Sequence, residues 1–144
     1  MILYLDSSAY IKNYLKEAGR EQVMELMEAS GIIASHEVAF VEISAAFERA
    51  YREQRLNAEQ LRQAHLQFNE DWPSTLVIAT NDRLLKDAVG LVRQFPLKAY
   101  DAMHLAAARA LQQENNAEIV FACFDGQLNR AARQAGFTVP GILS

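Results

Sequence analysis

The sequence predicts an α/β domain with one layer of mostly parallel sheet between two layers of helices. Short apolar runs alternate along the chain with helical patterns, and the runs end at residues typical of turns and helix caps. Alternation of this kind implies crossover connections, which make strands parallel and place helices on both faces of the sheet. The 144 residues, 51% of them hydrophobic, are enough for one domain, residues 1–144, with its own core.

The apolar runs predict about five short strands. The first run stops at Asp6-Ser7-Ser8, a sequence typical of a buried strand that leads into a helix N-cap. In chain order, the predicted strands are Ile2–Leu5, Ile32–Ala34, Leu76–Ile78, Ile119–Phe124 and Phe137–Val139.

The segments between these runs carry apolar residues at helical spacing. Gly31, Pro73 and Gly136 mark helix ends, because glycine favours the position after a helix and proline cannot continue one. Seven helices are predicted. They run from Ser7 through Lys16, from Glu21 to Ala29, from near Glu37 (after Ser35 or His36) to about Gln54, from Asn57 to Trp72, from residues 80–82 to about Arg93, from near Asp101 to near Glu114, and from Asp125-Gly126 to Gln134.

Composition excludes several classes of protein. No apolar run approaches the ~20 residues of a membrane helix, and the apolar start at Met1 has no basic leader, so we expect neither a membrane span nor a secretory signal. The single cysteine, Cys123, excludes a disulfide framework and a multi-cysteine zinc site, and predicts a reducing, cytoplasmic location. A net charge of −4 argues against a basic nucleic-acid coat, but it is compatible with a local acidic site whose charge metal ions offset.

Two carboxylates follow predicted strands directly. Asp6 comes after the first strand and Asp125 after the fourth. Ligands of open parallel sheets bind at the carboxyl ends of strands, so both residues are candidates for a site. Each also has a structural interpretation as a helix N-cap, which is the more common role of an aspartate at such a junction.

Two further carboxylates lie on predicted helices. Glu42 has Val38, Ala45 and Ala46 at helical spacing, so it projects from an apolar face, where an unpaired charge costs several kcal/mol. The alternative is an ion pair, for example with Arg49. Asp101 opens an alanine-rich helix, where an N-cap is again the alternative.

As a set, the four carboxylates predict more than any one of them. If they converge, like charges share one pocket and need a counter-charge. Mg²⁺ or Mn²⁺ suits a site made only of oxygen ligands, and such a metal supports displacement at phosphorus. From the residues alone we therefore predict an acidic metal site, and the sequence does not show that the four converge.

The same residues carry a family resemblance. In chain order the segments are Leu5-Asp6-Ser-Ser-Ala, Val41-Glu42-Ile43, Leu97-Lys-Ala-Tyr-Asp101-Ala-Met-His-Leu-Ala106, Phe124-Asp125-Gly-Gln-Leu128, Ala131-Ala132 and Gly136-Phe-Thr-Val139. This pattern, which spans residues 1–139, resembles the PIN-domain ribonucleases, and specifically the VapC toxins of type II toxin–antitoxin pairs. The segment around Asp101 is its most specific part.

The resemblance implies a site and a function. It implies the fold of that family, a sandwich of helices around a parallel sheet, and a quartet of Asp6, Glu42, Asp101 and Asp125 that holds Mg²⁺ or Mn²⁺ and hydrolyses RNA with metal-activated water. Ser8 matches a position near that site. The implied partners are an RNA substrate, a VapB-like antitoxin and a second copy of the chain. The sequence departs from the family pattern at Cys123, where many members carry Thr or Ser.

Other residues and functions stay open at this point. His104, three residues after Asp101, either lines the site or is a packed helical histidine, which is the more common case. Arginines and lysines after the strand ends are candidate phosphate contacts, among them Arg49, Arg83 and Lys86. The alternatives in function are a PIN nuclease for RNA processing without an antitoxin, and a nuclease-inactive PIN binding module. A phospho-receiver domain lacks its expected acidic pair and lysine here.

Overall fold

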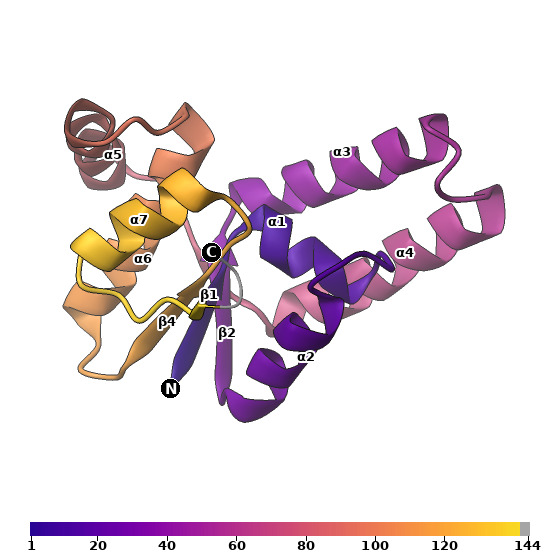
Figure 1. Ribbon diagram of the computed structural model, residues 1–144, viewed down its shortest axis with the longest axis horizontal. Coiled ribbons are helices and arrows are strands. Elements are labelled where there is room, and N and C mark those ends of the chain that lie inside the picture. Colours follow the sequence, from indigo (N-terminus) through magenta and orange to yellow (C-terminus); the bar gives the residue numbers. More distant parts are fainter. Residues whose placement is uncertain (142–144) are drawn as a thin grey trace.

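The computed structural model describes residues 1–141 (Figure 1). The last three residues of the predicted domain, 142–144, lie outside this part. The elements in chain order are β1 (Ile2–Leu5), α1 (Ser7–Tyr10), η1 (Ile11–Asn13), α2 (Arg20–Ala29), β2 (Ile32–His36), α3 (Val38–Arg52), α4 (Ala58–Asp71), η2 (Trp72–Ser74), β3 (Leu76–Ile78), α5 (Asp82–Gln94), α6 (Ala99–Glu114), β4 (Ile119–Ala122) and α7 (Gly126–Gln134).

The strands form one parallel sheet in the order β3-β2-β1-β4. Because all four strands are parallel, their carboxyl ends meet at the same edge of the sheet. Helices α1 to α4 cover one face and α5 to α7 the other (Figure 1). The predicted three-layer α/β/α architecture is confirmed.

Alternation along β1 shows how the sheet serves two cores. Ile2 and Tyr4 pack into the cluster formed with α5, α6 and α7, whereas Leu3 and Leu5 pack into the cluster formed with α1 to α4. Successive side chains of a strand point to opposite faces, and all four of these are buried. A strand apolar on both faces is what a sheet covered on both sides requires, which explains the continuous apolar runs in the sequence.

Two predicted elements differ in the structure. The fifth strand is reduced to one parallel bridge, Val120 to Thr138, and Pro140 then follows without an N–H group for a further ladder bond. The first helix does not reach Lys16: it ends as a 3-10 turn at Asn13, whose side chain donates to the carbonyl of Tyr10 at 3.1 Å. A side chain that bonds locally to the backbone competes with continuation of the helix.

Helices α3 and α4 pack side by side and extend away from the sheet (Figure 1). The predicted cap of α4 is confirmed as a capping box, in which Asn57 and Gln60 each accept from the other's backbone N–H. Within residues 1–141, no helix has the length and apolarity to cross a membrane.

Candidate active site

Asp6 lies at the carboxyl end of β1 and caps α1. Its Oδ1 accepts from the backbone N–H of Ala9 at 3.0 Å and from the hydroxyl of Ser8 at 2.7 Å. The side chain is nevertheless buried, and burial raises the pKa of Asp6 to about 6, against the opposing effects of His104 and of these hydrogen bonds. The cap interpretation is confirmed for this residue, and its burial with a raised pKa keeps it a candidate for the site.

Asp125 occupies the equivalent position after β4. It caps α7 by accepting from the backbone N–H of Leu128 at 2.9 Å. The neighbouring thiol of Cys123 points away from solvent and donates to Asn129 Oδ1 at 3.2 Å, while Asn129 Nδ2 donates to the Cys123 carbonyl at 3.1 Å. Cys123 is thus hydrogen-bonded to Asn129 through both its side chain and its carbonyl, just after the end of β4. Burial raises the pKa of the Cys123 thiol.

Glu42 projects from α3 toward α1 and α6. Its Oε1 accepts from the hydroxyl of Ser7 at 2.5 Å and lies 2.9 Å from Nε2 of His104. Burial acts to raise the pKa of Glu42, but the hydrogen bonds from His104 and Ser7 outweigh it and leave the pKa below its usual range. The alternative of an ion pair with Arg49 is wrong within the described residues, where the partner of Glu42 is His104.

Asp101 lies in the first turn of α6 and does not cap it. The N-cap residue is Lys98, so the helix begins earlier than predicted, at Ala99. The Asp101 carboxyl is half buried, and its pKa is raised first by burial and then by the charge of Asp125, with a smaller contribution from Glu42. An acid in the first turn interacts favourably with the helix dipole, and Asp101 is in addition repelled by two other acids.

The four predicted carboxylates interact with one another through their charges. Asp101 acts to raise the pKa of Asp6, while Asp125 and Glu42 act to raise that of Asp101. In the part of the chain that the structure describes, no three Asp, Glu, His or Cys side chains are gathered closely enough to hold a metal ion. The four carboxylates are therefore linked by mutual repulsion and do not form a metal cluster in this structure.

Ser8 and His104, the two predicted neighbours of the site, each contact one of the four carboxylates. Ser8 donates to Asp6 and accepts from the backbone N–H of Phe124 at 3.0 Å, so it ties the ends of β1 and β4 together. His104 is buried, as a packed histidine would be, and it also contacts Glu42. The packed interpretation is therefore confirmed for His104, and its contact with Glu42 places it beside one of the candidate site residues.

Sequence reasoning missed Ser7 and Tyr4. Ser7 donates to Glu42, and the Tyr4 hydroxyl lies 2.8 Å from Nδ1 of His104. The available signal was a tyrosine inside an otherwise apolar strand, because a buried tyrosine hydroxyl needs a hydrogen-bond partner. The hydroxyl of Ser7, which follows Asp6 in the sequence, was a second signal, because it is a hydrogen-bond donor beside a candidate site residue.

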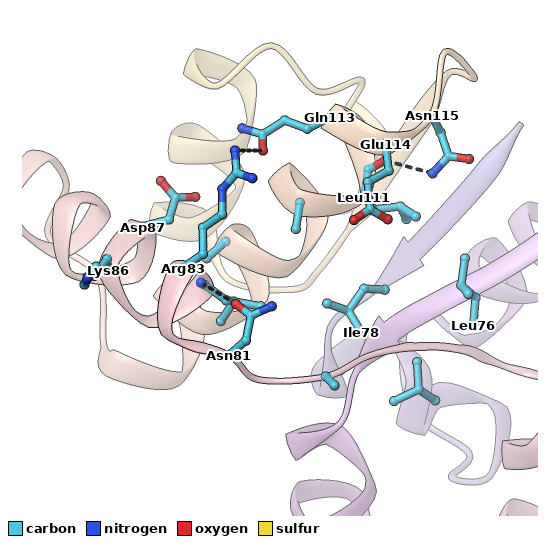
Figure 2. A pocket seen from close by; sticks show the side chains of 15 residues that line it. Leu76, Ile78, Asn81, Arg83, Lys86, Asp87, Leu111, Gln113, Glu114 and Asn115 are labelled. Atoms are coloured by element: carbon cyan, nitrogen blue, oxygen red, sulfur yellow. Dashed lines mark hydrogen bonds between the residues drawn. The ribbon is translucent and has the colours of Figure 1, made fainter.

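Two hollows adjoin these elements. The Glu42 groove, of about 470 Å³, is lined by Ser7, Ser8, Val41, Glu42, Arg49 and Tyr100 among others. The β3-edge pocket, of about 1010 Å³, lies between β3, α5 and α6 and contains none of the four carboxylates. Figure 2 shows Arg83 of this pocket directed at Gln113, with Lys86 nearby. Of the candidate phosphate contacts, Arg49 therefore lies beside the acidic site, whereas Arg83 and Lys86 line the other pocket.

The PIN domain family matches residues 3–134. This chain belongs to the PIN domain family. Among curated proteins, Ribonuclease VapC45 of Mycobacterium tuberculosis is 28% identical over 138 residues, covering 96% of this chain and 94% of the relative. The resemblance found in the sequence is thus confirmed along nearly its full length.

Solved structures show the same PIN fold. FitAcB from Neisseria gonorrhoeae superposes with a TM-score of 0.68 at 14% identity, covering 99% of this chain and 98% of the other. A toxin–antitoxin complex from Klebsiella pneumoniae gives a TM-score of 0.62 at 17% identity and covers 97% of both chains. At such identities these likenesses establish the fold of this PIN domain.

Proposed function

We propose that this PIN domain is a metal-dependent endoribonuclease, the toxin of a VapBC-type pair, that hydrolyses phosphodiester bonds in RNA. The observation that carries the proposal is the electrostatic interaction among four carboxylates from four separate elements. The relative named Ribonuclease VapC45, similar along 96% of this chain, supports the activity.

Mg²⁺ or Mn²⁺ fits the donor set of this site. All four candidate ligands, Asp6, Glu42, Asp101 and Asp125, offer carboxylate oxygens, which hard divalent cations prefer. The raised pKa values of Asp6 and Asp101 reflect burial and mutual repulsion that a cation would offset. When bound, the metal supplies Lewis-acid activation of water and charge neutralisation at phosphorus. Binding requires the carboxylates to close around the ion, since the described side chains do not form a closed cluster.

The residues of this chain hold the acids in place. Ser8 and the Ala9 amide fix one oxygen of Asp6, and the Leu128 amide fixes Asp125. These anchors lie on strand ends and helix starts, and sites built on rigid elements keep their geometry. Each anchor occupies Oδ1, and Oδ2 of each aspartate has no hydrogen-bond partner within the described residues.

The same site suggests how the partners would bind. Arg49 lines the Glu42 groove and offers a phosphate contact beside the acids, despite the overall charge of −4. The solved structure from Klebsiella pneumoniae is a toxin–antitoxin complex, which supports a VapB-like antitoxin as partner here. A homodimer and a cytoplasmic location complete the proposal.

Cleavage of purified total RNA by the antitoxin-free chain tests the activity. We expect discrete fragments with Mg²⁺ or Mn²⁺, none with EDTA, and none from Asp101→Asn. The matched control is Asp87→Asn, because Asp87 is also a helical aspartate but pairs with Arg109 at the β3-edge pocket. Cleavage that persists in EDTA, or in Asp101→Asn at the wild-type rate, would contradict the proposal.

A further inference from the structure

His104 connects a buried tyrosine to a site carboxylate. The Tyr4 hydroxyl of β1 lies 2.8 Å from Nδ1 of His104, and Nε2 of the same ring lies 2.9 Å from Oε1 of Glu42. The tyrosine and the histidine are almost fully buried, and their rings meet edge to face at 5.9 Å. Three elements, β1, α6 and α3, are therefore joined through one imidazole ring.

The proton positions follow from the two ends of this chain of contacts. An ionised carboxylate only accepts hydrogen bonds, so the contact between Nε2 of His104 and Oε1 of Glu42 requires a proton on Nε2. In the neutral ring, which has one donor and one acceptor nitrogen, Nδ1 is then the acceptor. The buried Tyr4 hydroxyl, 2.8 Å from Nδ1, is the donor that this arrangement needs.

The two oxygens of Glu42 are consequently unlike. Oε1 accepts from His104 and from the Ser7 hydroxyl, which itself lies 3.3 Å from Nε2 of His104. Within residues 1–141, Oε2 has no hydrogen-bond partner. Two donors on one oxygen fix the plane of a carboxylate and leave the other oxygen available to a ligand.

We propose that His104 is a positioning residue for Glu42: with its proton held on Nε2 by Tyr4, it fixes Oε1 and leaves Oε2 available to a divalent cation. The inference rests on the proposed function, in which Glu42 is a metal ligand. His36 provides a contrast, because this second buried histidine bonds Thr80 and the backbone N–H of Val38, and so holds the connection from β2 to α3.

Three substitutions separate positioning from packing. His104→Asn places its amide near the position of Nδ1 and does not reach Glu42, whereas His104→Gln carries an amide donor to the position of Nε2. Tyr4→Phe removes the group that assigns the ring proton. Its matched control is Tyr10→Phe, which also deletes a buried tyrosine hydroxyl, bonded at 2.6 Å to Thr75 and remote from the carboxylates.

The readouts are Mn²⁺ affinity by calorimetry, RNA cleavage against Mn²⁺ concentration, and the ¹⁵N shifts of the His104 ring in metal-free protein. We expect His104→Asn to weaken Mn²⁺ binding about 10–100-fold, the usual effect of losing a group that orients a ligand. His104→Gln should regain most of the affinity, Tyr4→Phe should lose part of it, and Tyr10→Phe should leave it unchanged. The ring shifts should report a proton on Nε2.

Two results would overturn the inference: equal Mn²⁺ affinity in His104→Asn and wild type, or a ring proton on Nδ1. Thermal melting of each variant identifies any that has not folded. If His104→Asn does not fold, the Mn²⁺ affinity of Tyr4→Phe decides in its place, and an affinity equal to that of wild type would overturn the inference. If wild type itself neither binds Mn²⁺ nor cleaves RNA with it, the proposed function fails, whereas the ¹⁵N shifts still decide whether the imidazole donates to Glu42.

Discussion

The acidic site and the β3-edge pocket show two ways in which a protein uses polar residues. The β3-edge pocket is the larger of these two hollows, yet its lining carries two cations and two anions, Arg83, Lys86, Asp87 and Glu114 (Figure 2). Of these, Asp87 pairs with Arg109. At the acidic site, by contrast, Asp6 and Asp101 are repelled by other carboxylates and their pKa values are raised, first by burial. The comparison teaches that unbalanced charge, rather than volume, distinguishes the candidate active site of this chain.

The largest expected effect comes from neutralising the acids. Asp6→Asn, Glu42→Gln and Asp101→Asn should each lower RNA cleavage by about 10³-fold or more, since Lewis-acid stabilisation contributes several kcal/mol and each 1.36 kcal/mol is tenfold in rate. Single-turnover cleavage with saturating Mg²⁺ measures the loss. A variant that cuts at the wild-type rate would remove its residue from the site.

The next effect is on stability in the absence of metal. The folded chain keeps the Asp6 proton up to about pH 6, whereas the unfolded chain releases it near the ordinary value of 3.8. Stability contributed by this group is therefore lost as the pH rises from about 4 to 6, by roughly 3 kcal/mol, and it stays lost at neutral pH. Asp6→Asn keeps a capping oxygen and should be more stable than wild type at pH 7 in EDTA.

Urea unfolding of wild type and Asp6→Asn between pH 4 and pH 7 measures this difference. Asp125→Asn is the matched control, because it is the same substitution at another N-cap whose side chain is less buried. Parallel pH profiles for wild type and Asp6→Asn would show that burial of Asp6 carries no electrostatic cost.

A smaller effect is expected for RNA binding. Arg49→Ala should raise the KM for RNA several-fold and reduce the slope of log affinity against log salt by about 1, as loss of one phosphate contact does. Arg52→Ala, on the same helix but outside the lining of the Glu42 groove, is the control. The measurement is the rate of RNA cleavage against RNA concentration, repeated at several salt concentrations. If the slope of log affinity against log salt is unchanged in Arg49→Ala, Arg49 does not contact a phosphate.

The smallest effect is expected at the β3-edge pocket. Arg83→Ala should change cleavage by about twofold at most, because substitutions at the surface away from a site cost within about 0.5 kcal/mol. The same cleavage assay measures it. A loss comparable to that of Arg49→Ala would place the RNA path across this pocket and reverse the comparison.

Much of the site could be predicted from sequence because its acids obey local rules. Asp6 and Asp125 follow buried strands, and parallel strands end at one edge, so their convergence is a property of the fold class. Glu42 stood out as a charge on an apolar face. The partner of Glu42 was beyond such rules, since Arg49 is close in sequence while His104 is 62 residues away and reaches it only through packing of α6 against the sheet.

The fold itself was predictable except at the ends of some elements. Four apolar runs became strands, among them the three-residue run Leu76–Ile78, whereas residues 137–139 formed one bridge before Pro140. The helix after Asp6 ended early because Asn13 bonds back to Tyr10, a choice between local side-chain and helical hydrogen bonds that periodicity does not encode.

The spacing of the four acids along the chain has a consequence for biosynthesis. Asp6 leaves the ribosome first and Asp125 last, separated by 119 residues, so at about 5–20 residues per second the site stays incomplete for roughly 6–24 s. During that interval β4, which pairs with β1, is missing. Ser8, next to Asp6, also lacks the hydrogen bond from the backbone N–H of Phe124. The proposed site is therefore incomplete in a nascent chain until residue 125 has been made.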